Sequence, residues 1–294
     1  MTGSERQRLA EAFEGHRPYL RSVAYRILGS LTEAEDAIQE CWIRLDRADA
    51  AEIVDLRGWL TTALARICLD ILRRRRSHRE EYPGTWLPEP ILDERPGGNP
   101  EQESVLSESI GLALLIVLEN LTPLERLTFV LHDVFAVPFH DVGKILGRST
   151  PATRQLARRA RHHIRTAAPS PDADPRVQRR MIDAFLAATR SGNFDALFDI
   201  LAPDVVLRAD VGAAPGAPRR GPLVGVDAVV DHMRRNAKEF ATYAHHIFIN
   251  GVAGLLVQPP AARSAAVSFT VAAGRITAID IIGQPKFRLS GPPR

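Results

Sequence analysis

Cysteine and long apolar runs are both scarce in this chain of 294 residues. Its two cysteines, Cys41 and Cys68, lie far apart in the sequence, each on the apolar face of a predicted helix. This pattern favours buried thiols over a disulfide or a metal centre, and no motif indicates a cofactor. No run of about 18 apolar residues is present, which excludes a membrane-spanning helix. The N-terminus lacks the basic and then apolar segments of a signal peptide, so we expect a cytoplasmic protein.

Lysine is also scarce, because only Lys144, Lys238 and Lys286 among the 38 basic residues are lysines. The arginines gather in two segments, at 66–79 and 148–165, and acidic residues collect between these segments. The formal net charge of the whole chain is only +3. Two basic patches on a nearly neutral chain favour local contacts with a polyanion such as nucleic acid.

Two breaker-rich segments divide the chain into three predicted domains. Residues 1–78 are predicted to be helical, and a linker at 79–104 carries prolines at 83, 88, 90, 96 and 100. A second helical domain follows at 105–167, and a short linker rich in proline and aspartate lies at 168–175. Residues 176–294 form the third domain.

The third domain has a different pattern, in which helices come before strands. Helices are predicted at 176–190, 193–201 and 226–240, and a strand at 205–210. Two hairpins follow, one turning at Asn250-Gly251, the dipeptide preferred in type I′ turns, and one near Gly274-Arg275. This order predicts an α+β domain with a curled antiparallel sheet, so the fold class is multi-domain: two all-α domains and one α+β domain.

The first helical domain carries two polar helix faces. The stretch SLTEAEDAIQECWIRL contains Thr32 and Glu35, which we interpret as a capping box that starts a helix. Asp36, Gln39 and Glu40 share one edge of that helix, which either is a plain solvated face or contacts a partner. The next helix, RGWLTTALARICLDILRRRR, leaves its polar and aromatic side chains off the apolar stripe: Trp59, Thr61, Thr62, Arg66, Asp70. Its terminal arginines, including Arg73 and Arg74, complement the helix dipole or, together with Trp59, suit single-stranded DNA.

The second helical domain has the pattern of a helix-turn-helix. Thr122 is predicted as the N-cap of a support helix, and Gly147-Arg148 as the turn before a second helix at Thr150. The apolar side of that second helix leaves a polar face opposite it: Ser149, Arg154, Gln155, Arg158, Arg161. Arginine reads guanine and glutamine reads adenine in a major groove, so this face is predicted to bind duplex DNA.

Taken together, residues 10–165 resemble the extracytoplasmic-function sigma factors of bacterial RNA polymerase. The resemblance makes 1–78 sigma domain 2 and 105–167 sigma domain 4, and it implies RNA polymerase core enzyme and promoter DNA as partners. It assigns core binding to Asp36, Gln39 and Glu40, because the clamp helices that they would meet are basic in that family. It also assigns two sets of DNA-reading residues. The −10 set is Trp59, Thr62, Arg66, Arg73, Arg74, and the −35 set is Ser149, Arg154, Gln155, Arg158, Arg161.

The linker stretch GTWLPEP resembles a motif of a long subgroup with a fused SnoaL-like domain of the cone-shaped nuclear-transport-factor fold. The resemblance implies that residues 176–294 form such a domain, and we predict that this domain acts in place of a separate anti-sigma factor. That subgroup has an Asp-Gly-Gly-Gly-Lys loop, of which Asp210 and Gly212 are present here and the lysine is not. Since Trp86 is restrained by prolines, we predict that Trp86, Leu87 and Pro88 dock on the C-terminal domain.

Two other functions remain open from the residues themselves. A helix-turn-helix regulator binds duplex DNA without polymerase, but it has no need of the carboxylate edge or of the Trp59 helix. An enzyme or ligand sensor in the C-terminal domain needs an acid or base in an apolar pocket. Its polar candidates are Asp210, His232, His245, His246, Asp280.

Overall fold

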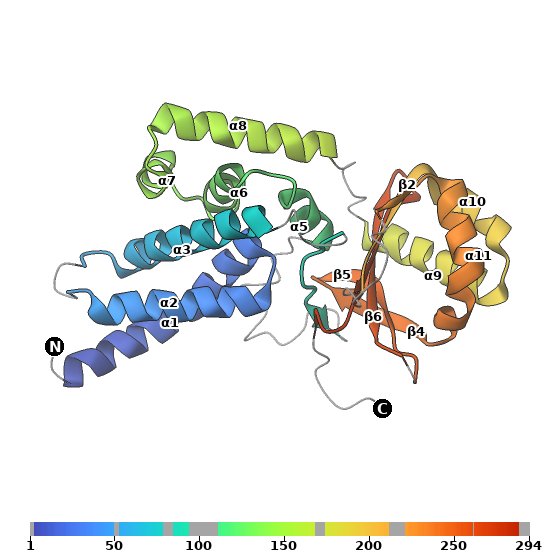
Figure 1. Cartoon of the computed structure of the whole chain (residues 1–294), viewed down its shortest axis with the longest axis horizontal. Coiled ribbons are helices and arrows are strands. Elements are labelled where there is room, and N and C mark those ends of the chain that lie inside the picture. Colours follow the sequence, from blue (N-terminus) through green and yellow to red (C-terminus); the bar gives the residue numbers. More distant parts are fainter. Residues whose placement is uncertain are drawn as a thin grey trace. The chain divides into compact units, whose positions relative to one another are not determined.

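The computed structural model describes residues 3–49, 53–78, 85–93, 111–167, 174–211, 221–260 and 262–287 (Figure 1). The chain forms two compact units. The first comprises Met1–Glu81, Glu101–Glu108 and Val117–Ala167. The second comprises Tyr82–Pro100, Ser109–Ile116 and Ala168–Arg294.

Three helices build the first part of the first unit: α1 (Gly3–Leu28), α2 (Leu31–Arg47) and α3 (Leu56–His78). Their shared core is fully buried and is made of large aliphatic side chains, among them Leu20, Ile27, Ile38, Leu60, Leu64. The predicted capping box at Thr32 and Glu35 is wrong. Gly29, at φ 67°, ends α1, and Ser30 is the N-cap of α2, accepting a hydrogen bond from the Glu33 amide at 3.2 Å.

The second part of this unit is the predicted helix-turn-helix, with its support helix. It follows α5 (Leu112–Leu118) and consists of α6 (Pro123–Phe129), the π-helical turn η3 (Val130–Val134), α7 (Phe139–Leu146) and α8 (Thr150–Ala167). Thr122 is the N-cap of α6, as predicted, and forms a reciprocal capping box with Glu125.

Two glycines shape the turn between α7 and α8. Gly147 ends α7 in the left-handed region at φ 64°, which costs glycine little. A Cβ on Gly143 would lie 2.8 Å from the carbonyl oxygen of Arg148, so only glycine fits where α7 approaches the turn. The predicted turn at Gly147-Arg148 is therefore confirmed.

The two helical parts contact each other within the first unit. The ring of Tyr19 on α1 meets the ring of Phe135 edge to face, with 5.5 Å between centroids. The guanidinium of Arg26 lies 5.2 Å from the centroid of the same Phe135 ring. Helices α3 and α6 also pack against each other.

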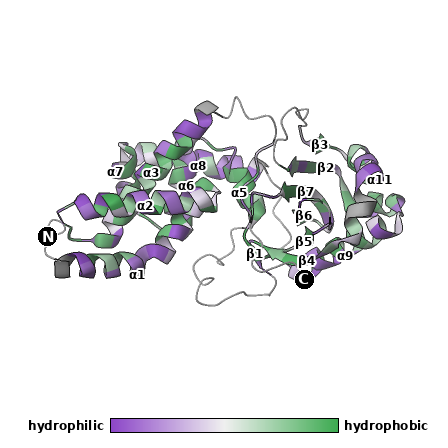
Figure 2. Ribbon diagram, turned by 60° about the horizontal axis from the view of Figure 1, so that its bottom comes forward, coloured by the Kyte–Doolittle hydropathy of each residue, from purple (hydrophilic) through white to green (hydrophobic). Residues whose placement is uncertain are grey.

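Apart from Ser109–Ile116, which contains most of α5, the second unit is a seven-stranded sheet with helices on one side (Figure 1). Its helices are α9 (Pro175–Ser191), the short η4 (Phe194–Ala196) and α10 (Leu197–Ile200), and α11 (Val226–Thr242). Its strands are β1 (Leu92–Asp93), β2 (Leu201–Asp210), β3 (Leu223–Val224), β4 (Ala244–Ile249), β5 (Val252–Val257), β6 (Ala265–Ala272) and β7 (Arg275–Gly283), in the order β1-β4-β5-β6-β7-β2-β3. The core between helices and sheet includes Phe185 and Phe269, whose ring centroids are 5.1 Å apart. Strands β4 to β7 are mainly hydrophobic in colour (Figure 2).

The sheet is mixed, whereas the sequence analysis expected it to be antiparallel. Strand β2 pairs with β7 in parallel, with Leu207 opposite Ile279 and Arg208 opposite Asp280. The intervening chain contains α11 and four strands, so it is long enough for the crossover that a parallel pair needs. The type I′ turn is confirmed by positive φ values at Asn250 (51°) and Gly251 (75°).

The short strand β1 comes from the proline-rich stretch that was predicted to be only a linker. It pairs antiparallel with β4, with Leu92 opposite Ile249. Asn250 secures the same edge, because its amide donates to the Ile91 carbonyl at 2.8 Å and its side-chain oxygen accepts from the Ile91 amide at 3.0 Å. Part of the predicted linker therefore folds with the C-terminal sheet.

Candidate functional site

The carboxylates of α2 fall into two groups with different surroundings. Glu35 pairs with Arg21 at 3.0 Å and Glu33 forms an ion pair with Arg75, so both residues tie α2 to neighbouring helices. Asp36 and Gln39 are exposed on another edge. Glu40 lies beside them, half-exposed, and accepts from Arg44 on the next turn at 3.0 Å. The edge Asp36–Gln39–Glu40 is thus left available to a partner.

Helix α3 presents a line of side chains at spacings of three, four and seven residues: Trp59, Thr62, Arg66, Arg73. Arg66 and Arg73 are exposed, and Trp59 and Thr62 are half-buried, so both aromatic and cationic groups are accessible. Arg74 follows Arg73 and donates through Nε to the Asp70 carbonyl at 3.4 Å.

Thr61 does not belong to this accessible set, contrary to the sequence analysis. It is 5% exposed and donates to the Arg57 carbonyl at 2.7 Å. Its hydroxyl also lies 3.4 Å from the Tyr19 hydroxyl, so it joins α3 to α1. The polar group is buried because both hydrogen bonds compensate for its removal from water.

Helix α8 has one buried and one exposed side, as a recognition helix requires. Thr153, Ala157 and Ala160 are fully buried. The five predicted DNA-reading residues are all exposed: Ser149, Arg154, Gln155, Arg158, Arg161. They are not equivalent, however.

Arg161 is the exception within that set. Its Nε lies 2.6 Å from the Asp133 carboxylate on η3, so part of its charge is neutralised within the fold. The guanidinium of Arg154 lies instead 5.8 Å from the centroid of the Phe139 ring on α7, the other helix of the motif.

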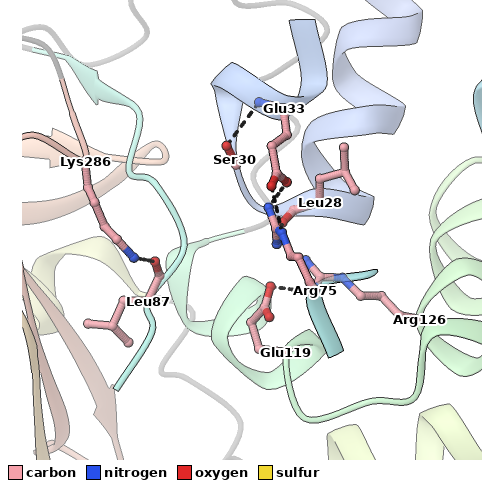
Figure 3. Close-up of polar contacts among 8 residues, drawn as sticks. All are labelled: Leu28, Ser30, Glu33, Arg75, Leu87, Glu119, Arg126 and Lys286. Carbon is pink, nitrogen blue, oxygen red and sulfur yellow. Dashed lines mark hydrogen bonds and ion pairs between the residues drawn. The ribbon is translucent and has the colours of Figure 1, made fainter. Parts of the chain in front are cut away.

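The linker segment with Trp86, Leu87 and Pro88 lies against the C-terminal domain in the second unit. Leu87 is fully buried, and its amide donates to Asp210 Oδ2 at 2.8 Å. Its carbonyl accepts from Lys286 Nζ at 2.8 Å (Figure 3). Lys286 also forms an ion pair with Asp210 and lies 4.4 Å from the centroid of the Trp86 ring. We call Trp86, Leu87, Asp210 and Lys286 the linker anchor.

Sequence reasoning did not find Lys286. The resemblance directed attention to the loop after Asp210, where a lysine was expected and is missing. The cation comes instead from Lys286 in the C-terminal stretch GQPKFRL, 76 residues further along the chain. A useful signal was available, because an aspartate next to an apolar strand needs a cation and the chain has only three lysines.

Three of the five polar candidates for chemistry in the C-terminal domain, Asp210, His246 and Asp280, are each held by a charged partner, and His245 is exposed. Asp210 belongs to the linker anchor, and Asp280, 1% exposed, binds Arg208 at 2.6 Å. Burial raises the pKa of Asp280, and Arg208 opposes this effect. His246 pairs with Asp183 at 2.9 Å. Within the described ranges, no cluster of three or more His, Cys, Asp or Glu side chains forms a metal site.

Comparison with known proteins identifies the family of this chain. The family described as sigma-70 region 2 matches residues 12–78. SigJ, an ECF RNA polymerase sigma factor of Mycobacterium tuberculosis (strain H37Rv), is 44% identical over 222 residues, which cover 74% of this chain and 70% of SigJ. The chain belongs to the ECF RNA polymerase sigma factors. SigI, described as a probable ECF sigma factor of the same species, is 32% identical over 96% of this chain and 95% of its own.

The whole architecture agrees with this family. The crystal structure of M. tuberculosis SigJ superposes with a TM-score of 0.74, at 34% identity, covering 94% of this chain and 96% of that one. As an ECF sigma factor, the chain acts in transcription initiation with RNA polymerase and promoter DNA. It combines helical sigma domains with a SnoaL-like α+β domain, and none of its described helices has the length and apolarity needed to cross a membrane.

Proposed function

We propose that this sigma factor uses three separate helix faces for its three tasks. The Asp36–Gln39–Glu40 edge of α2 binds basic residues of core polymerase. The Trp59 face of α3 binds the −10 element, and the polar face of α8 reads the −35 element. The observation that carries the first assignment is the division of the α2 carboxylates. Glu33 and Glu35 pair with arginines of other helices, whereas Glu40 pairs with Arg44 of α2 itself and Asp36 is exposed.

We further infer that the SnoaL-like domain regulates the sigma domains through the linker anchor. The anchored segment, 85–93, lies in the chain between the −10 and −35 domains, so holding it restrains the connection between them. In this proposal the fused domain takes the place of a separate anti-sigma factor. Catalysis by that domain is disfavoured, since Asp210 and Asp280 already bind a lysine and an arginine.

Charge reversal tests the polymerase interface. We expect Asp36→Arg and Glu40→Arg to weaken binding to core polymerase and to reduce promoter-specific run-off transcription. Leaving the basic partner unpaired in a buried interface costs about 2 to 5 kcal/mol. Binding is measured by co-elution of the purified chain with core enzyme, and circular dichroism checks that the helices persist.

The matched control is Asp199→Arg, an equal charge change at an exposed position of the C-terminal domain. Co-elution of both α2 variants at the level of this control would refute the assignment of the α2 edge. Membership of the sigma family would be unaffected by that result.

A further inference from the structure

A pocket of about 260 Å³ lies between the end of α3 and the start of α6 in the first unit. Its wall contains three arginines, Arg75 and Arg76 from α3 and Arg126 from α6, and one acidic residue, Glu119. Figure 3 shows Arg75 and Arg126 near Glu119. None of the roles proposed above uses this pocket.

Arg126 is the most unusual residue of the wall. Its side chain is 2% exposed, and its Nη1 group donates to Glu119. Its Nε and Nη2 groups are buried and have no hydrogen-bond partner in the described structure. Burying an unmatched donor of a charged group is costly, so the site favours a ligand that supplies acceptors. Water can accept these bonds but brings no compensating negative charge.

The charges of the wall indicate what kind of ligand fits. The lining contains three guanidinium groups and the Glu119 carboxylate, and Glu33, outside the lining, pairs with Arg75, so these five charged groups keep a net charge of +1. Arg75 is already held by Glu33 and by the Leu28 carbonyl at 2.7 Å, so its guanidinium is fixed in place before any ligand binds. Guanidinium forks match the oxygen atoms of phosphate in geometry as well as charge.

Size and burial narrow the choice of phosphate. Pockets for drug-sized ligands usually measure about 300 to 1,000 Å³, so this pocket suits a smaller compound. The DNA backbone is disfavoured, because Arg126 lies too deep for a phosphate that remains part of a duplex. We propose that the pocket binds the dianionic phosphate group of a small molecule, with Arg75, Arg76 and Arg126 as its ligands.

Such binding has a consequence for transcription. Arg75 and Arg76 end the helix whose other face is proposed to bind the −10 element, and Arg126 belongs to the support helix of the −35 domain. A phosphate held by both helices keeps the two DNA-reading domains together. This consequence rests on the proposed function, whereas the binding itself does not.

Calorimetric titration of the full chain with inorganic phosphate and with pyrophosphate tests the binding, using chloride at equal ionic strength as the reference. We expect saturable binding with one ligand per chain. Preference for pyrophosphate indicates a phosphoanhydride such as that of a nucleotide, and preference for phosphate indicates the free ion or a monoester.

Two variants and one control locate the site. Arg76→Ala removes an exposed guanidinium, and we expect affinity to fall about tenfold or more, as for other hydrogen bonds to charged groups. The double variant Arg126→Met/Glu119→Gln removes both charges of the buried ion pair, so that neither charge is left buried without its partner. The control is Arg47→Ala, an exposed arginine at the end of α2.

Hydrogen–deuterium exchange gives a second readout, which does not depend on any variant. Phosphate should slow exchange at 70–76 and 119–126. The proposal is overturned if neither anion binds saturably, if Arg47→Ala weakens binding as much as Arg76→Ala, or if exchange slows only outside these two segments. The proposal is likewise overturned if Arg76→Ala weakens the binding of short duplex DNA but changes the binding of neither anion.

Discussion

The two cysteines show how burial alone decides the chemistry of a residue. Cys41 and Cys68 are free and fully buried, as predicted, and Cys41 Sγ donates to the Leu60 carbonyl at 3.8 Å. Burial raises the pKa of Cys41 to about 11 and raises the pKa of Cys68 even further. The thiolate is the reactive form, and neither residue reaches it near neutral pH.

We therefore predict that neither thiol reacts with Ellman's reagent in the native chain at pH 8. Both should react promptly once guanidinium chloride unfolds the protein, because the unfolded thiols recover an ordinary pKa. Absorbance of the released thiolate measures the reaction. Rapid titration of one thiol in the native state would show that the shared core of α1, α2 and α3 opens easily.

His246 makes the stability of the C-terminal domain sensitive to acid. Burial and nearby Arg179 lower the pKa of His246, and these effects outweigh the attraction of Asp183. As the pH falls below about 6.5, the unfolded chain takes up a proton that the folded chain resists. This contribution to stability is therefore present at neutral pH and is lost on acidification.

Urea unfolding of the full chain between pH 7.5 and pH 5.5 tests this prediction. The unfolding midpoint should fall with pH, and His246→Asn should reduce that fall. His245→Asn, at the exposed neighbouring position, is the matched control and should leave the pH dependence as it is. If the unfolding midpoint of His246→Asn falls with pH as much as that of the native chain, His246 is not the source of this pH dependence.

At the scale of elements, the sequence was most informative where the structural signals are local. Thr122-Pro123 and Gly147 define helix ends by their own chemistry, and the helix-turn-helix between them was predictable. The start of α2 was not, because Ser30/Glu33 and Thr32/Glu35 overlap as capping boxes and the position of Gly29 decides between them. Strand β1 was missed because its partner, β4, lies more than 150 residues away in the chain.

The exposed face of α8 should separate residues that read bases from residues that do not. We predict that Arg154→Ala or Gln155→Ala relaxes base preference at one position of the −35 element, at about 1 to 3 kcal/mol per contact. Arg161→Ala should weaken all sequences alike and by less, because Arg161 shares its charge with Asp133.

Equilibrium binding to a set of −35 duplexes, each changed at one base pair, measures these effects at several salt concentrations. The salt dependence for Arg161→Ala should become slightly flatter. Equal losses on every duplex for all three variants would mean that the reading face lies elsewhere on α8.

At the scale of the whole molecule, the least predictable feature is the linker anchor. Trp86 was recognisable as an aromatic residue restrained by prolines, and its docking on the C-terminal domain was expected. Its partners were not, because Asp210 and Lys286 are brought together only by the parallel pairing of β2 with β7 and by the tail that follows. Contacts of this range depend on the folded sheet, and no local pattern encodes them.

The anchor also yields the prediction with the widest consequence. Lys286→Met leaves the Asp210 carboxylate buried without its cation, a change that typically costs about 3 to 5 kcal/mol. We expect this variant to release Leu87 and expose Trp86, and we expect Lys286→Met and Trp86→Ala to change promoter-specific transcription in the same direction.

Trp86 fluorescence, with Trp42 and Trp59 replaced by Phe, should move to longer wavelength in Lys286→Met. Lys144→Met, which removes an exposed lysine, should leave that emission unchanged. If Lys286→Met shifts the emission without changing transcription, the anchor holds the linker but does not regulate the sigma domains.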